Sequence, residues 1–305
     1  MQQNKDVRII LNPAADNGRG IQHKEAILEI AEPYARVDFM VSDSAEHARH
    51  LAKEAVEAGY SLVVAAGGDG TVHHIVNGIM AASNSETMLG VIPIGSGNDF
   101  AYANGIPTNV QQAAECLFIG QPRWLDLAKV EDDNGRSVIM DNNFGIGFDA
   151  MVVAQTEKIT RVHGFPKYML AVFKTLAFYF KPVRLRIRFD DESVTQSAIF
   201  LYLGIGPRGG GGFLLTPNAK QDDGLVDSCL AKDMSRLTAI SLLGKAIKGS
   251  HIHSPHVSMR ASRVIVINID DPAPIYVDGE MFAYPEDFIR AVTITSLPKA
   301  IRLLV

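Results

Sequence analysis

An apolar segment, residues 61–66, ends directly in the turn sequence Gly67-Gly68-Asp69-Gly70-Thr71. The apolar residues that follow are three or four positions apart, which predicts an amphipathic helix: Val72, Ile75, Val76, Ile79 and Met80. Glycines let the backbone approach a bulky anion, and free N–H groups at a helix start can hold phosphate oxygens. Because the Asp69 carboxylate would repel phosphates unless a cation lay between them, the turn predicts a metal-assisted phosphate site. For the isolated motif, the alternative is a tight turn without function.

The composition is that of an ordinary globular protein of one or two domains. The chain has 305 residues, 47% of them hydrophobic, and a formal net charge of -5. This charge argues against a nucleic-acid partner, because no basic excess exists to neutralise a phosphate backbone. Two distant cysteines, Cys116 and Cys229, form neither a metal pair nor a disulfide framework, which fits a reduced cytoplasmic setting.

No signal peptide is visible in the polar start of the chain, and the most apolar stretch, residues 168–180, is too short to span a bilayer. We therefore expect a soluble cytoplasmic protein, or one bound peripherally at the inner face of the cell membrane.

The first part of the chain alternates strand and helix patterns. Apolar runs at Val7–Leu11, residues 61–66 and Leu89–Ile94 alternate with helical spacing around residues 48–56 and 109–119. Such alternation predicts a parallel sheet with helices on both faces. Ligands of such sheets bind at the carboxyl ends of the strands, where both glycine-containing turns, Gly67–Thr71 and Gly95–Asp99, are expected to lie.

From about Asp126 the pattern changes to short strands. Leu185, Ile187 and Phe189 alternate with three arginines, which predicts a half-buried strand. Further strands are expected at residues 198–204, 225–231, 264–269, 275–277 and 292–295, and helices at about 150–160 and 167–181. We expect an α/β domain over residues 1–127 and a mainly antiparallel β-sandwich or partly closed barrel over 128–296, with the tail 297–305 returning to the first domain.

Three further clusters could carry chemistry, and each has a plain structural alternative. In Gly95–Asp99, Asp99 could simply cap a helix. Asp222-Asp223-Gly224 before an apolar strand is also an ordinary turn sequence. Asp278-Gly279 could be the turn of a type I′ hairpin, and a continuing strand would place Asp278 and Glu280 on the same side.

Taken together, these motifs resemble diacylglycerol kinase catalytic domains, and among them the soluble bacterial lipid kinases. The resemblance covers most of the chain, from Leu11 to Glu280. Five motifs occur in the family's order: Asn12-Pro13, Gly67–Thr71, Ile92–Ala101, Pro217–Gly224 and Val277–Glu280. The segments Asn143–Ala150 and Gly210–Phe213 also fit the soluble bacterial group.

The resemblance implies a two-domain enzyme of the NAD kinase/diacylglycerol kinase-like fold, with ATP and Mg²⁺ bound between a nucleotide domain and a lipid-substrate domain. Residues of the first domain that would lie near the nucleotide are Asn12, Ser42, Gly67, Gly68, Asp69, Gly70, Thr71, Val72, His73, His74, Ser96, Asn98 and Asp99. His73 and His74 stand where the family usually has Asn-Glu. They could contact the nucleotide or form a solvated helix turn, and the second interpretation is favoured because no carboxylate neighbours them in sequence.

The resemblance also implies roles for the acidic residues. Asp69 and Asp99 would belong to a network around magnesium, in which Asp126 is a less certain member. A structural Mg²⁺ site would take the carboxylate of Asp223, or of its competitor Asp222, together with the backbone carbonyls of Lys220 and Leu225. Glu280 or its neighbour Asp278 would accept the proton of the substrate hydroxyl, and the sequence does not separate the two.

Aromatic residues are frequent between residues 165 and 180 and could form core or line a groove for an acyl chain: Phe165, Tyr168, Phe173, Phe178, Tyr179 and Phe180. Arg184, Arg186 and Arg188 could meet anionic lipid head groups, or form a solvated face that resists edge pairing.

We expect a kinase that uses ATP and Mg²⁺ to phosphorylate a lipid hydroxyl, of diacylglycerol or a related alcohol. The alternatives are a soluble kinase of the NAD kinase type, which shares the Gly67–Thr71 motif, and a catalytically idle nucleotide- or lipid-binding regulator. The expected partners are a lipid substrate and, transiently, a membrane surface. A homodimer is one possible assembly, since the sequence does not decide the oligomeric state.

Overall fold

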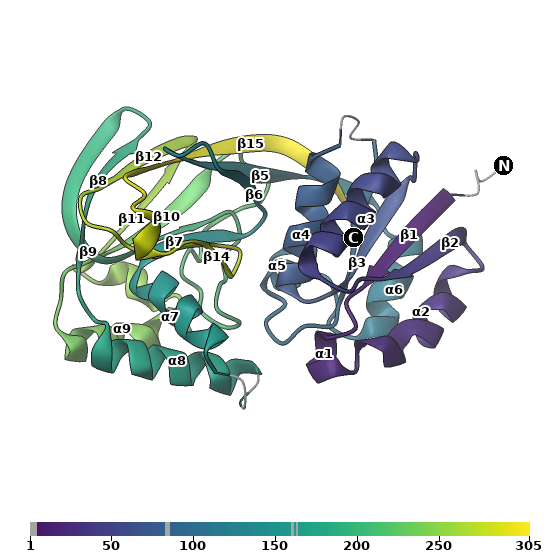
Figure 1. Cartoon of the computed structure of the whole chain (residues 1–305), viewed down its shortest axis with the longest axis horizontal. Helices are drawn as coiled ribbons and strands as arrows, with labels where there is room; N and C mark the ends of the chain where they lie inside the picture. The colour runs from purple at the N-terminus through teal and green to yellow at the C-terminus, as the bar shows by residue number, and fades with distance from the viewer. Residues whose placement is uncertain (1–4, 83–85, 160–161, 163) are drawn as a thin grey trace. The chain divides into compact units, whose positions relative to one another are not determined.

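The computed structural model describes residues 5–82, 86–159, 162 and 164–305 (Figure 1). The chain folds into two compact units. The first contains residues 1–125 and 299–305, and the second contains residues 126–298. Two strands, β5 (Pro122–Asp132) and β15 (Ala291–Leu304), carry the chain from one unit into the other.

The first unit is built on a parallel sheet in the order β2-β1-β3-β4. Its strands are β1 (Lys5–Leu11), β2 (Ala35–Val41), β3 (Leu62–Gly67) and β4 (Met88–Pro93). Strands β3 and β4 are buried along their whole length, as expected for a parallel sheet covered on both faces. The end of β15 extends the sheet, because Leu303 pairs in parallel with Leu89 of β4.

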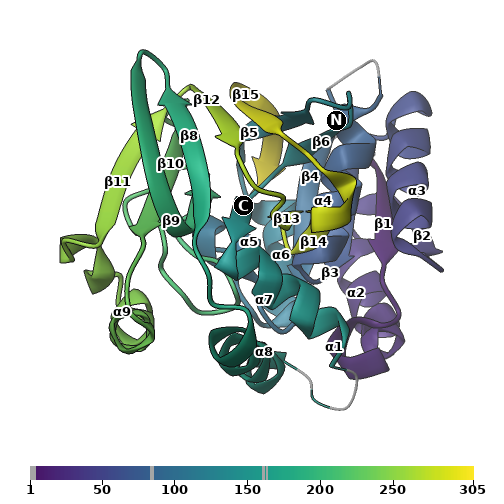
Figure 2. The same cartoon turned by 60° about the vertical axis from the view of Figure 1, so that its left-hand side comes forward.

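Helices cover this sheet, with α3 packed against α4 and α2 against α6 (Figures 1 and 2). The helices of the unit are α1 (Ala15–Gly18), α2 (Lys24–Ala31), α3 (Ala45–Glu57), α4 (Asp69–Met80), α5 (Asp99–Asn104) and α6 (Val110–Ile119), with a short 3₁₀ turn, η1 (Gly20–His23). Helix α3 begins where the Ser44 side chain accepts a hydrogen bond from the His47 N–H. Gly78 lets α3 and α4 approach closely, because a Cβ there would lie 2.2 Å from the Arg49 carbonyl oxygen.

The second unit is mainly antiparallel. Its strands follow the order β14-β13-β7-β9-β8-β12-β15, while β10 pairs with β9 and β11, and β5 pairs with β6. They are β6 (Ser137–Met140), β7 (Asn143–Gly147), β8 (Val183–Phe189), β9 (Glu192–Gly204), β10 (Val226–Lys232), β11 (Val257–Ser262), β12 (Val264–Ile269), β13 (Ile275–Val277) and β14 (Glu280–Ala283). Strand β8 alternates buried and exposed residues as predicted, with the three arginines exposed. Two of them, Arg184 and Arg186, form ion pairs with Asp270.

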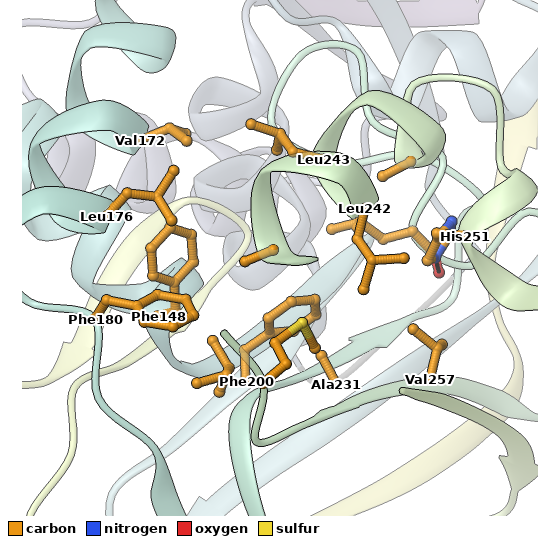
Figure 3. Close-up of a pocket in the computed structure, with 15 residues that line it drawn as sticks. Phe148, Val172, Leu176, Phe180, Phe200, Ala231, Leu242, Leu243, His251 and Val257 are labelled. Atoms are coloured by element: carbon orange, nitrogen blue, oxygen red, sulfur yellow. Dashed lines mark hydrogen bonds between the residues drawn. The ribbon is translucent and has the colours of Figure 1, made fainter. Parts of the chain in front are cut away.

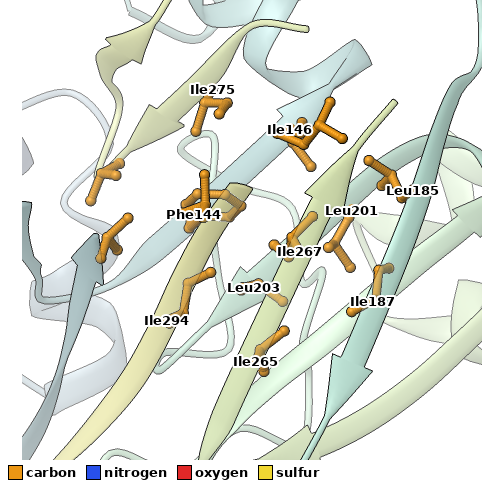
Figure 4. Packing of buried hydrophobic residues seen from close by; sticks show 14 of the residues in the cluster. Phe144, Ile146, Leu185, Ile187, Leu201, Leu203, Ile265, Ile267, Ile275 and Ile294 are labelled. Atoms are coloured by element: carbon orange, nitrogen blue, oxygen red, sulfur yellow. The ribbon is translucent and has the colours of Figure 1, made fainter. Parts of the chain in front are cut away.

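Buried aliphatic side chains from these strands form one large core (Figure 4). Phe144 and Ile146 of β7, Leu201 and Leu203 of β9, and Ile265 and Ile267 of β12 are all at most 1% exposed. The fold class is therefore confirmed: an N-terminal α/β unit with a parallel sheet and a C-terminal, mainly antiparallel β unit.

Three helices lie together at one end of the second unit (Figures 1 and 2). They are α7 (Phe148–Glu157), α8 (Gly164–Phe178) and α9 (Arg236–Ala246), and the unit also has two 3₁₀ turns, η2 (Ser250–His253) and η3 (Pro285–Asp287). Helices α7 and α8 agree with the sequence prediction, although Thr160 lies outside the described residues. Among the described residues, no helix is long and apolar enough to cross a bilayer.

Candidate active site

The two glycine-containing turns of the first unit are in direct contact. A Cβ on Gly95 would lie 2.4 Å from the Cα of Gly68, a distance no side chain tolerates. Gly67 is restricted in the same way, because its Cβ would lie 2.3 Å from the Thr71 Oγ1. A Cβ on Gly68 would be tight as well, at 3.2 Å from the Cα of Gly95. Glycine at positions 67 and 95 therefore lets the ends of β3 and β4 come together.

Polar side chains around these turns fix the loop geometry. Asn12 donates a hydrogen bond from Nδ2 to Thr71 Oγ1 at 3.1 Å, and its Oδ1 accepts one from the Ala14 N–H at 2.9 Å. Asn98 has a left-handed backbone (φ 52°) and is hydrogen-bonded to the backbone of Gly95 in both directions. The structure thus joins the start of the chain, the first glycine turn and the second one.

Other predicted nucleotide residues differ in their exposure. Ser42 is buried, and its hydroxyl donates to the Leu11 carbonyl oxygen at 3.2 Å. Ser96 is exposed, and Val72, in α4, is buried. The rings of His73 and His74, in α4, meet edge to face with centroids 5.1 Å apart. His73 is only 4% exposed and His74 is half-buried, so the favoured interpretation of a solvated helix turn is wrong for His73.

The Asp69 and Asp99 carboxylates are close enough to repel each other. Burial, together with the charge of Asp99, raises the pKa of the Asp69 carboxyl to about 6. The Asp69 carboxylate also accepts a hydrogen bond from the Phe100 N–H at 3.0 Å, at the start of α5. Hence the starts of α4 and α5 hold two carboxyl groups near each other, and such oxygen ligands suit a hard divalent cation.

In the second unit, Asp278 and Gly279 form the turn between β13 and β14. Both have positive φ, 50° and 84°, as a type I′ hairpin requires. The buried Asp278 carboxylate accepts three backbone N–H groups, from Asp141 and Asn142 at 2.9 Å and from Asn143 at 2.7 Å. Glu280 is exposed at the first position of β14. The strand does not continue through the turn, so the two carboxylates have different surroundings.

A second acidic cluster surrounds the loop before β10. Asp126 accepts a hydrogen bond from the Gly224 N–H at 2.6 Å, and the exposed Asp223 accepts one from the Leu225 N–H at 3.0 Å. Asp222 and Lys220 are exposed on the same loop. Sequence reasoning missed Asp227, in β10: burial and the charge of Asp223 raise the pKa of its carboxyl to about 6.

Asp149 is a further buried carboxyl group that the sequence gave little reason to single out. It lies in the first turn of α7, and its Oδ2 has no hydrogen-bond partner, although the Tyr276 hydroxyl is near enough to favour the ionised form. Burial raises the pKa of Asp149 well above its ordinary value. The sequence signals were its place in the motif Asn143–Ala150 and its position in the first turn of a predicted helix, where acidic residues usually interact with the helix N-terminus.

The second unit contains an apolar pocket between α8, α9 and the sheet (Figure 3). It encloses about 550 Å³ between its atoms, including its open mouth. Its walls include Val172 and Leu176 of α8 and Leu242 and Leu243 of α9, and its lining has one polar side chain, that of His251.

Of the aromatic stretch predicted to form core or a groove, Phe180 lines this pocket. Tyr168 packs against Phe213 with ring centroids 5.7 Å apart, while Phe173, Phe178 and Tyr179 are exposed. The side chain of Phe165 lies outside the described part of the chain.

Comparison with known families agrees with this arrangement. Residues 6–130 match the diacylglycerol kinase catalytic domain, and residues 142–305 match the YegS C-terminal NAD kinase beta sandwich-like domain. The chain belongs to the diacylglycerol kinase and YegS-like lipid kinase family. The family resemblance expected from the ordered motifs is therefore confirmed.

Relatives of this family member match over nearly their whole length. A diacylglycerol kinase of Mycobacterium tuberculosis (strain ATCC 25618 / H37Rv) is 30% identical over 302 residues, which cover 98% of this chain and 94% of that protein. A diacylglycerol kinase of Bacillus subtilis (strain 168) is 30% identical over 292 residues, covering 90% of each. A crystal structure from Bacillus anthracis str. Sterne superimposes on 100% of this chain and 98% of its own, with a TM-score of 0.81 at 21% identity, which shows a shared fold.

Proposed function

We propose that this protein is an ATP- and Mg²⁺-dependent lipid kinase that transfers the γ-phosphate to the hydroxyl of diacylglycerol or a related lipid alcohol. Family membership supports a kinase. The observation that carries the lipid acceptor is the apolar pocket of the second unit, because a small polar acceptor has no use for a pocket lined by fourteen apolar side chains and one histidine.

The first unit supplies the phosphate-binding half of the proposal. Phosphoryl transfer requires mainly positioning and charge neutralisation, and backbone N–H groups at the start of a helix provide both without a side chain. Gly67–Thr71 opens α4, and Gly95–Asp99 leads into α5 in direct contact with it. Under this proposal, these two turns hold the phosphates of ATP.

The carboxyl groups of Asp69 and Asp99 would hold the magnesium ion near the phosphates. The raised pKa of Asp69 supports this assignment, because crowding of two carboxylates is relieved when a divalent cation binds between them. When bound, the metal neutralises charge on the transferred group. For the structural Mg²⁺ site, we propose the carboxylate of Asp223 and the backbone carbonyls of Lys220 and Leu225 as ligands. Asp222 is the alternative carboxylate ligand, and Asp227 supplies a second carboxylate nearby.

The geometry favours Glu280 over Asp278 as the base that accepts the hydroxyl proton. Three backbone donors occupy three of the roughly four lone-pair sites of the Asp278 carboxylate and hold it in place. Glu280 is exposed and has no such network of backbone donors among the described residues. We therefore assign Glu280 the proton transfer and assign Asp278 the positioning of residues 141–143.

A substrate panel tests the function directly. Purified protein is incubated with γ-labelled ATP, MgCl₂ and either diacylglycerol, a monoacylglycerol, another long-chain alcohol or NAD. We expect label in the organic phase, and we expect none when EDTA replaces MgCl₂. Label on NAD alone would support the soluble-kinase alternative, and ATP binding without any product would support the regulator.

Site variants separate chemistry from folding. Glu280→Gln and Asp69→Asn should each lower turnover by about 100-fold or more, because each removes one charge from the transfer step. Their melting temperatures should stay near that of the parent protein. Full activity in either variant would remove that residue from the mechanism.

A pocket variant tests the acceptor assignment. Ala239→Phe places a ring into the pocket wall and should lower kcat/KM for long-chain diacylglycerol while ATP binding is unchanged. The matched control is Ala261→Phe, which adds the same ring at an exposed position of β11. Equal kinetics in the two variants would remove the pocket from acceptor binding.

A further inference from the structure

Helices α8 and α9 each have one face that lines the pocket and another face that is exposed to solvent. One face of each lines the apolar pocket, through Val172 and Leu176 on α8 and Leu242 and Ala246 on α9. The other faces expose large apolar side chains to solvent. They carry Leu170 (49% exposed), Phe173 (55%) and Phe178 (77%) on α8, and Leu237 (79%), Ile240 (47%) and Ile247 (49%) on and just after α9.

These exposed side chains form a concentrated patch. Fifteen large apolar side chains are exposed in the described part of the protein, and seven of them, the six above and Tyr179, lie within residues 164–181 and 236–248. Single exposed apolar residues are ordinary, but a cluster on adjacent elements marks an interaction surface. We call the six residues named first, with the basic residues below, the outer face of α8 and α9.

The charged residues of α8 and α9 and of the segments that directly follow them are all basic, while the exposed Asp233 lies three positions before α9 begins. Residues 164–181 contain Lys167, Lys174 and Lys181 and no acidic residue, and residues 234–256 contain Arg236, Lys245 and Lys248 and no acidic residue. The chain as a whole has a net charge of -5, so this positive charge is a local departure from the rest. On α8, Lys174 follows Leu170 by one helical turn, so basic and apolar side chains share one face.

Apolar side chains flanked by lysines and arginines on a surface helix are the pattern of segments that lie in a membrane interface. The apolar side chains enter the acyl region, while the basic groups bind anionic head groups. A protein partner would need an apolar groove with acidic walls, and nothing in this chain indicates one. An anionic bilayer meets both requirements along its whole surface.

We propose that the outer face of α8 and α9 docks this protein on an anionic lipid bilayer. This inference rests on the proposed function, since the pocket that would accept the lipid is walled by the inner faces of the same two helices. Docking through these helices would bring the pocket that their inner faces line close to the lipid source. The arginines on β8 are not required, because Arg184 and Arg186 are already paired with Asp270.

Vesicle flotation tests the docking surface. The full-length protein is mixed with vesicles of phosphatidylcholine alone or of equal parts phosphatidylcholine and phosphatidylglycerol. We expect flotation with the anionic vesicles, weaker flotation with the neutral ones, and a decrease at high salt. Phe173→Ser with Leu237→Ser should weaken binding to the anionic vesicles by about tenfold or more. Lys174→Gln with Lys245→Gln should weaken it by about 30-fold, at a factor of about five per charge near the surface.

Matched controls separate this surface from general effects on solubility. Ile119→Ser removes an apolar side chain that is 69% exposed in the first unit, and Lys53→Gln removes a lysine whose side chain is 45% exposed on α3. Both controls should float like the parent protein. If they lose binding as strongly as the outer-face variants, the docking surface is wrongly placed.

A soluble acceptor distinguishes this inference from the proposed function. With short-chain diacylglycerol below its critical micelle concentration, the outer-face variants should keep the parent's kinase activity. Kinase activity in a parent protein that does not float would overturn the docking surface and leave the proposed function standing. Flotation without any kinase activity would overturn the proposed function and support the surface. A concentration-dependent dimer, lost in Phe173→Ser with Leu237→Ser and without flotation, would assign the face to a second copy and overturn the proposal.

Discussion

Asp278 and Asp149 are two buried aspartates of the second unit that differ in their hydrogen bonds. Asp278 accepts three backbone N–H groups and closes the β13–β14 turn against residues 141–143. Asp149 accepts a single one, from Ala150 at 3.0 Å, and its second oxygen has no partner. Burial is similar for both, so the two groups differ in how many hydrogen-bond donors compensate the loss of water around their oxygens.

The comparison shows how one unit holds acidic groups for two purposes. Asp278, with three backbone donors, supports the local structure. Burial of Asp149, which has fewer donors, raises its pKa, so this carboxyl group keeps its proton at a higher pH than an ordinary aspartate does. Four variants can test this difference, in order of expected effect.

Asp278→Ala should have the largest effect on stability. It leaves three buried backbone N–H groups without an acceptor, so the free energy of unfolding should fall by about 3–5 kcal/mol. Urea unfolding at pH 7 measures this change, and Asp278→Asn, which keeps one acceptor oxygen, should lose less. An alanine variant as stable as the parent protein would show that residues 141–143 do not depend on this carboxylate.

Gly145→Ala should have the next largest effect. A Cβ at this position would lie 2.1 Å from Asp149 Oδ2 and 2.2 Å from the Tyr276 ring, so both must move. We expect a loss of about 1–3 kcal/mol in urea unfolding. Combining the change with Asp149→Ala should restore part of the loss, whereas a fully additive double variant would place the strain elsewhere.

Asp149→Asn should change the pH dependence of stability more than stability itself. Burial raises the pKa of Asp149 in the folded state above its ordinary value of 3.8, so the folded state binds the proton more tightly than the unfolded chain. The parent protein should therefore lose stability as the pH rises above about 4, with a slope of up to about 1.4 kcal/mol per pH unit for this group. An amide does not titrate, so Asp149→Asn should equal or exceed the parent by about 1–2 kcal/mol at pH 8.

Unfolding curves between pH 4 and pH 8 measure that difference, since all other groups titrate alike in both proteins. A constant difference across this range would mean that Asp149 is ionised in the fold.

Tyr276→Phe should have the smallest effect. Its hydroxyl is the one side-chain group that favours the ionised form of Asp149, so its removal should raise the pKa of Asp149 further. We expect a loss of about 1 kcal/mol or less in unfolding at pH 7. A loss that is unchanged in the Asp149→Asn background would show that the tyrosine acts through packing alone.

The sequence predicted strands and helices correctly where the hydrophobic pattern of a segment agrees with how that segment is buried. The apolar runs before Gly67 and Gly95 predicted strands of a covered parallel sheet, and the alternation around Leu185 predicted a half-buried strand, as the structure shows. Helix α9 escaped prediction because Leu237 and Ile240 are exposed, so apolar residues lie on both of its faces and blur the helical period.

The candidate site was predictable to the level of motifs and no further. Glycine turns with one acidic residue carry a recognisable pattern, and the structure brings Gly68 and Gly95 together as their positions after adjacent strands required. The partners of Asp278 are more than 130 residues away along the chain, and no local pattern encodes them. The same holds for Asp227, whose pKa depends on burial in β10 and on Asp223 across a turn.

The pairing of Leu303 with Leu89 has a consequence for synthesis. Residues 299–305 leave the ribosome only after the whole of the second unit, residues 126–298, has been made. Until then, the backbone N–H and C=O groups at the edge of β4 lack the partner strand β15, while the second unit is being made. A translating chain stalled before Lys299 would expose that edge, which makes the first unit a candidate for chaperone binding until its last strand arrives.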